Sequence, residues 1–198
     1  MRNAPWTPAR KHNALRRGPH KLAMEELELL QEEFASMLNK SQWTLLPADL
    51  VVGLQHLWLS PLGVIPQRNR RPRSIVDYTF SDVNANTVLL TPHDALQFGQ
   101  ALHRLLSKIL QVDPRFGPVY ISKVDIANGF YRIWLLPRDI PKLGILFPTA
   151  SGQPTLIAFP LTLPMGWVES APFSCAATET VADLANVAYS CPAVAPPH

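Results

Sequence analysis

Proline occurs in this chain at a density that excludes long uninterrupted helices. The 198 residues include 20 prolines, about twice the ~5% of an average protein. A proline inside a helix removes a backbone hydrogen bond and clashes with the preceding turn. We therefore exclude a helical bundle and a coiled coil. Hydrophobic residues make up 47% of the chain, which is enough for a buried core and argues against disorder throughout.

Helical and strand-like patterns alternate irregularly along the chain. Apolar residues recur at helical spacing over 22–39, from Thr91 to Ile109, and over 170–187. Alternating or continuously apolar runs predict strands at 62–66, 74–78, 119–126, 131–136, 142–147 and 155–163. The stretch 43–63 is apolar without a clear period. This order predicts an α+β fold rather than a doubly wound parallel sheet.

Basic residues are concentrated in two short segments. Residues 1–21 contain six Lys or Arg and no acid, and residues 68–73 contain four arginines, so together they hold ten of the 18 basic residues. Positive charge focused in this way attracts polyanions. For residues 1–20 three interpretations stay open: a basic disordered tail, which we take as the domain boundary; a basic arm on nucleic acid; and a transit peptide, which the prolines disfavour. Residues 21–198 are expected to form the folded domain.

The segment 68–73 separates two predicted strands. A basic loop between apolar strands predicts a hairpin whose tip faces an anion. The candidate nucleic-acid-binding residues at this tip are Arg68, Arg70 and Arg71.

No segment has the pattern of a membrane span or a secretory signal. No apolar run approaches the ~18–20 residues of a membrane helix, and no apolar stretch follows the first arginines. Cys175 and Cys191 form no CxxC pair, and we interpret them as free thiols in a reducing compartment. We therefore expect an intracellular protein, cytoplasmic or nuclear, that is not secreted and has no membrane partner.

Asp125 is the candidate metal ligand. It ends an otherwise apolar predicted strand in SKVDIANGFYRI, where Asn128-Gly129 and two aromatic residues follow. A carboxylate at a strand end beside a turn suits Mg²⁺, which takes one or two carboxylates together with phosphate oxygens and water. The alternative interpretation is that Asp125 only caps the turn.

Three segments, in matching order and spacing, resemble the reverse transcriptase family (RNA-directed DNA polymerases). SPLGVIPQRNRRPRSIVDY resembles the fingers, SKVDIANGFYRI the first palm motif, and LPMGWVESAPFSCAATET the motif before a palm helix. The similarity covers roughly 57–187 and is closest to polymerases of long-terminal-repeat retrotransposons. It implies fingers at about 21–118, a partial palm at about 119–187, an irregular tail at 188–198, and an antiparallel sheet with packed helices.

The resemblance also implies the residues of a site. Arg73 falls on the fingers arginine that contacts the incoming nucleotide, and Met165 and Gly166 fall on a turn that approaches nucleotide and template. Phe130 falls on the aromatic residue beneath the nucleotide sugar; core packing is its alternative role. Asp125 falls on a catalytic carboxylate that binds metal in two-metal nucleotidyl transfer, with Mg²⁺ as the cofactor.

The chain departs from the family pattern at two places. If the family's lysine that contacts the triphosphate falls at Gln67, its charge is lost in this chain unless Arg68 or Arg70 substitutes for it. The family also has an aromatic-x-Asp-Asp hairpin that completes the catalytic carboxylates. After Asp125 this chain has four acids, none adjacent to another: Asp139, Glu169, Glu179 and Asp183.

We therefore expect a fragment of a retrotransposon reverse transcriptase, cut before the Asp-Asp hairpin. Whether it belongs to a longer polyprotein stays open. The intact enzyme would use dNTP and an RNA or DNA template-primer, whereas this isolated chain is expected to be inactive in DNA synthesis. The alternative is a noncatalytic remnant that binds nucleic acid or another protein.

Overall fold

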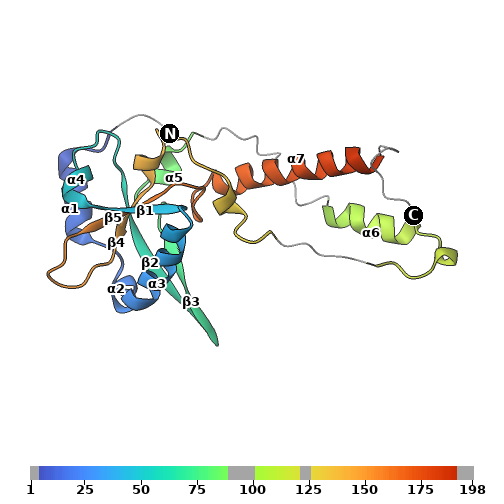
Figure 1. The fold of residues 1–198 in the computed structure, drawn as a ribbon, viewed down its shortest axis with the longest axis horizontal. Coiled ribbons are helices and arrows are strands. Elements are labelled where there is room, and N and C mark those ends of the chain that lie inside the picture. The colour runs from blue at the N-terminus through green and yellow to red at the C-terminus, as the bar shows by residue number, and fades with distance from the viewer. Residues whose placement is uncertain (1–4, 89–100, 121–125, 191–198) are drawn as a thin grey trace. The chain divides into compact units, whose positions relative to one another are not determined.

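A computed structural model describes residues 5–88, 101–120 and 126–190 of the chain (Figure 1). The chain divides into two compact units, one of residues 1–89 and 130–170 and the other of residues 90–129 and 171–198. Each unit is considered by itself. In the described ranges, no helix combines the length and the apolar character needed to cross a membrane.

The first unit is built on a five-stranded sheet with the strand order β1-β5-β4-β2-β3. The strands are β1 (Trp43–Pro47), β2 (Leu59–Gln67), β3 (Arg70–Val76), β4 (Gly144–Phe147) and β5 (Leu156–Pro160). The expected mixture of helices and strands is confirmed. The expectation of an antiparallel sheet is wrong for one pair, because β2 runs parallel to β4 while the other three pairs are antiparallel. The long connection between β2 and β4 permits this, since parallel strands need a crossover.

The central strands carry the core of this unit. β4 is buried along its whole length and β5 along almost all of it, as expected for strands covered on both faces. The expected strands at 142–147 and 155–163 are therefore confirmed in part of each range. The expected strand at 131–136 is wrong, because a 3₁₀ turn, η3 (Phe130–Arg132), takes up its first residues and only Trp134 bridges to Thr162.

Two consecutive helices take the place of the helix expected over 22–39. They are α2 (Lys21–Glu25) and α3 (Leu27–Asn39), separated at Glu26. The expected apolar stripe of α3 faces the core, where Phe34 packs edge-on against Trp43 of β1 and Phe147 of β4. This packing places one face of α3 beside the sheet.

The segment expected as a disordered tail contains helix α1 (Pro8–Arg17), which packs on the first unit. Trp6 is only 6% exposed and stacks on Trp58, with ring centroids 5.7 Å apart. Ala14 is also buried, and so is Lys11, whose aliphatic stem can cover apolar surface. Burial of these groups offsets the entropy cost of ordering the segment, which charge composition alone does not reveal.

Short elements connect the strands of the first unit. The helices α4 (Ala48–Val51) and α5 (Val83–Asn86) follow β1 and β3, and the 3₁₀ turn η4 (Ile140–Leu143) leads into β4. The stretch 43–63, which had no clear period, therefore contains β1, α4 and the start of β2.

The described part of the second unit is mainly helical. It contains α6 (Ala101–Gln111), the 3₁₀ turn η2 (Pro114–Phe116) and most of α7 (Ser170–Ser190). α7 confirms the helix expected at 170–187, and α6 confirms the later half of the helix expected from Thr91, whose start lies outside the described residues. Most of the strand expected at 119–126 also lies outside the described residues, and so does Asp125.

Candidate functional site

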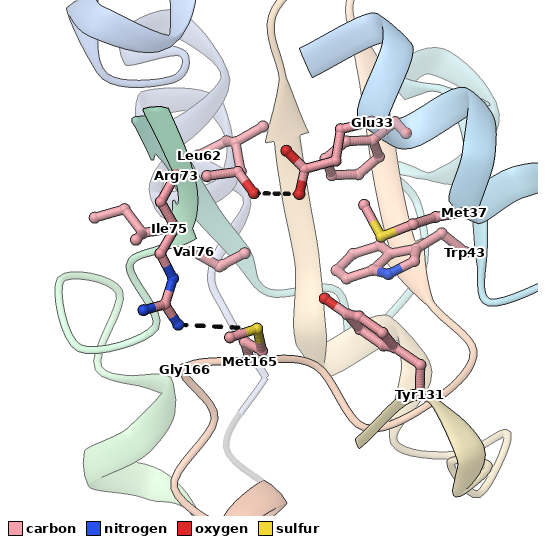
Figure 2. Close-up of a pocket in the computed structure, with 12 residues that line it drawn as sticks. Glu33, Met37, Trp43, Leu62, Arg73, Ile75, Val76, Tyr131, Met165 and Gly166 are labelled. Atoms are coloured by element: carbon pink, nitrogen blue, oxygen red, sulfur yellow. Dashed lines mark hydrogen bonds between the residues drawn. The ribbon is translucent and has the colours of Figure 1, made fainter. Parts of the chain in front are cut away.

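A pocket of about 240 Å³ opens in the first unit between α3, β3 and the turn at Met165–Gly166 (Figure 2). One side of it is an apolar wall to which Phe34, Met37 and Trp43 contribute. The polar side chains that line the pocket are Glu33, Arg73, Ser74 and Tyr131. The pocket thus combines an apolar wall with one cation, one carboxylate and two hydroxyl groups.

Arg73 and Met165 approach each other although 92 residues separate them in the chain. Arg73 lies on β3 opposite Ile65 of β2, and its side chain is exposed at the edge of the pocket. The Nη2 atom of Arg73 lies 4.0 Å from the sulfur of Met165, and a dashed line marks this contact in Figure 2. Two residues that the family resemblance implied for one site therefore meet in the fold.

Gly166 allows its turn to lie directly against the end of β3. Its φ is +93°, and a Cβ atom there would lie 2.9 Å from the carbonyl oxygen of Val76. The amide of Asn84 holds the turn from the other side: Nδ2 donates to the Gly166 carbonyl and Oδ1 accepts from the N–H of Val168, both at 3.0 Å. Only glycine satisfies both the backbone conformation and the close approach.

The polar side chains of the pocket affect one another electrostatically. The Ser74 hydroxyl donates to Oε1 of Glu33 at 2.7 Å. Burial raises the pKa of Tyr131, the negative charge of Glu33 raises it further, and the positive charge of Arg73 lowers it in part. Tyr131 therefore stays a neutral hydrogen-bonding group well into the alkaline range.

A basic hairpin tip lies beyond the pocket. β4 pairs with Leu59–Pro61 of β2, whereas from Leu62 onward β2 pairs with β3, and Figure 1 shows this hairpin extending past the other strands. The tip turns at Asn69, whose φ is +59°, a conformation that asparagine tolerates better than most residues. The hairpin predicted for 62–78 is confirmed.

The arginines of the tip differ in their partners. Arg71 pairs with Glu32 of α3 at 2.9 Å, an exposed pair of the kind that contributes little to stability. Arg68 and Arg70 are exposed and form no ion pair with any carboxylate in the described ranges. Their charge is therefore available to an external anion.

Phe130 does not line the pocket in the described structure. Phe130 is half-buried at the start of η3 and is not one of the lining residues, whereas its neighbour Tyr131 is. Asp125 lies outside the described residues. The described ranges hold no group of three His, Cys, Asp or Glu side chains that could bind a metal ion, so Mg²⁺ remains a prediction tied to Asp125.

Sequence reasoning missed Glu33 and Tyr131. Tyr131 could have been found, because it follows Phe130 directly in the motif. Glu33 carried no signal, since it is one of several acids beside the apolar stripe of α3. No protein-family model matches this chain, and no curated protein is significantly similar to it. Its function is therefore inferred from the site.

Proposed function

We propose that this chain is the fingers and part of the palm of an RNA-directed DNA polymerase of the long-terminal-repeat retrotransposon kind, and that its pocket receives part of a nucleoside triphosphate. The proposal is carried by one observation: Arg73 and the turn at Met165–Gly166 line the same pocket. Both were assigned to the nucleotide on sequence resemblance alone. Their approach across 92 residues is not a consequence of local sequence, so it supports that assignment.

The size and lining of the pocket suit a flat ring with a phosphate chain outside it. A volume of about 240 Å³ is below the ~300–1,000 Å³ of pockets that enclose a whole small ligand, so only the base or the sugar would enter. Phe34, Met37 and Trp43 give the pocket an apolar wall for that ring. Arg73 is exposed at the edge, where its planar guanidinium can bind phosphate oxygens through two parallel hydrogen bonds.

The proposal also assigns nucleic-acid binding to the hairpin tip. Arg68 and Arg70 have no ion pair among the described carboxylates, and the tip reaches past the other strands (Figure 1). Contacts from such arginines to phosphates give affinity without sequence preference. We assign these residues to template or primer binding and assign no catalytic step to the described residues. Catalysis would depend on Asp125 and Mg²⁺.

A pair of neighbouring arginines tests the proposed pocket. Arg73→Ala removes a guanidinium that lines the pocket, and Arg71→Ala removes one from the same strand that does not. We expect Arg73→Ala to weaken the binding of a fluorescent dNTP to the whole chain about ten-fold, as for a lost hydrogen bond to a charged group. Arg71→Ala should change it less than about two-fold.

Two outcomes would contradict the proposal. The first is an equal effect of both substitutions, which would mean that only the general positive charge of β3 matters. The second is the absence of dNTP binding to a chain that still binds oligonucleotides through Arg68 and Arg70. This second outcome would support the alternative of a noncatalytic nucleic-acid-binding protein.

A further inference from the structure

A second pocket of about 350 Å³ lies in the first unit between α1 and the segment that follows β3. It shares no lining residue with the pocket that contains Arg73. Its polar lining includes Arg10, Asn13 and Arg17 of α1, and its aromatic lining is Trp6 and Phe80. None of these residues has a role in the proposed nucleotide site.

Each arginine of this pocket lies over an aromatic ring. The Cζ atom of Arg10 is 4.3 Å from the ring centroid of Trp6, and that of Arg17 is 4.1 Å from the ring centroid of Phe80. A ring beneath the guanidinium limits its orientations and leaves the N–H groups in its plane directed sideways. The two cations are thus positioned before any ligand arrives, which lowers the entropy cost of binding.

The rings are held by contacts of their own. Trp6 is stacked on the buried Trp58. The backbone N–H of Phe80 donates to Oδ1 of Asp77 at 2.8 Å, which fixes the turn after β3. The stacked arginines therefore belong to the folded unit rather than to a free arm.

The charge of the pocket is positive. Arg10 pairs with Asp82 at 2.8 Å and donates to the carbonyl of Ser81 at 3.3 Å. Arg17 has no ion pair with any carboxylate that the structure describes. α1 itself contains three arginines and one lysine and no acid. The single carboxylate on Arg10 leaves an excess of cations facing the pocket.

The spacing of the donors matches an extended anion. Arg10, Asn13 and Arg17 are three and four residues apart, so they lie along one face of the helix. The seven steps along the helix from Arg10 to Arg17 correspond to a rise of about 10 Å. A row of donors of this length suits successive phosphates better than one isolated ion.

We propose that this pocket binds the sugar–phosphate backbone of a single-stranded nucleic acid. Grooves that bind single strands combine positive charge with aromatic or guanidinium planes on which bases can stack. This pocket has these features, because it is concave, carries an excess of positive charge and contains two arginines that lie over aromatic rings. The site is independent of the hairpin tip and of the nucleotide pocket, and it gives the N-terminal basic segment a defined role.

Adjacent arginines again provide a matched pair of variants. Arg17→Ala removes a cation that lines the pocket, whereas Arg16→Ala removes one from the next position of the same helix, which does not line it. Binding of a labelled single-stranded oligonucleotide to the whole chain is measured at several salt concentrations. We expect Arg17→Ala to weaken binding about five-fold and to reduce the salt slope by about 0.7, as for one phosphate contact. Arg16→Ala should change affinity less than about two-fold.

The ring beneath Arg17 is tested by rescue. Phe80→Leu keeps an apolar side chain but removes the ring, and we expect about a three-fold loss of affinity. Phe80→Tyr keeps the ring and should restore wild-type binding. Equal losses in both variants would show that Phe80 does not act by orienting Arg17.

Two further experiments show which site and which ligand account for the measured binding. The Arg17→Ala effect is measured again with Arg68 and Arg70 replaced by alanine, and we expect the same fold-change, because independent contacts add in free energy. Inorganic tripolyphosphate, at matched phosphate concentration, should compete much less well than unlabelled oligonucleotide. Equal loss in Arg16→Ala and Arg17→Ala, or equal competition by tripolyphosphate, would overturn the proposal. If replacing Arg68 and Arg70 leaves oligonucleotide binding unchanged while Arg17→Ala still weakens it, the result counts against the proposed function and leaves this site standing.

Discussion

The two pockets of the first unit hold arginine in opposite ways. In the pocket of Arg73, the guanidinium shares the space with the carboxylate of Glu33 and an apolar wall, so its charge is partly balanced. In the pocket of α1, two guanidinium groups lie on aromatic rings, and one carboxylate pairs with Arg10. The first environment suits a ligand with an uncharged ring and one charged end. The second suits an anionic chain.

The largest expected effect tests whether the α1 pocket is part of the folded core. Trp6 is 6% exposed and stacked on Trp58, so Trp6→Ala should lower the free energy of unfolding by about 3 kcal/mol. Phe80, on the other wall, is 52% exposed, and Phe80→Ala should cost less than about 1 kcal/mol. Urea denaturation of the three proteins measures both values. A small effect of Trp6→Ala would mean that α1 is only loosely attached.

The next effect concerns the turn that closes the pocket of Arg73. In Gly166→Ala the new Cβ would lie 2.9 Å from the carbonyl of Val76 at a φ of +93°, and we expect a loss of about 2–3 kcal/mol. Gly152 is the matched control, because its φ is +82° but nothing lies within 4 Å of its Cβ position. Gly152→Ala should therefore cost only about 1 kcal/mol. Equal losses in urea denaturation would show that the close approach to β3 has no energetic weight.

The smallest expected effect is a change in the pKa of Tyr131. Arg73→Ala should raise this pKa further, because the cation lowers it, and Glu33→Gln should lower it, because the carboxylate raises it. An NMR pH titration of the tyrosine ring follows both changes. Arg17→Ala, in the other pocket, should leave this pKa unchanged. Shifts of the same sign in Arg73→Ala and Glu33→Gln would contradict the arrangement of charges in the pocket.

The raised pKa of Tyr131 also gives a direction to the pH dependence of stability. The folded chain holds this proton to a higher pH than the unfolded chain, whose tyrosines have a pKa of about 10. The stabilisation is fully present below that pH and is lost as the pH rises through the pKa of folded Tyr131.

Local patterns predicted the elements whose apolar residues follow one period. The sequence predicts an apolar stripe at positions 27, 30, 34, 37 and 38 of α3, and three of its members, Leu30, Phe34 and Met37, are buried. The basic segment between two apolar runs predicted the β2–β3 hairpin. The helix at 170–187 was predicted for the same reason. Three features were not predicted: the break between α2 and α3, the 3₁₀ turn at Phe130 and the parallel pairing of β2 with β4. Hydrophobic periodicity carries no information on which strands pair or in which direction.

The candidate site was likewise predicted only in part. Sequence motifs alone identify the arginines of 68–73, the glycine at 166 and the carboxylate at 125. Folding is what brings Arg73 to Met165, places Glu33 and Tyr131 in their pocket and packs α1 on the first unit. A motif specifies side-chain chemistry over a few residues, whereas a pocket depends on packing between segments far apart in the chain. The stacking of Trp6 on Trp58 is such a contact, and no periodic pattern in the sequence predicts it.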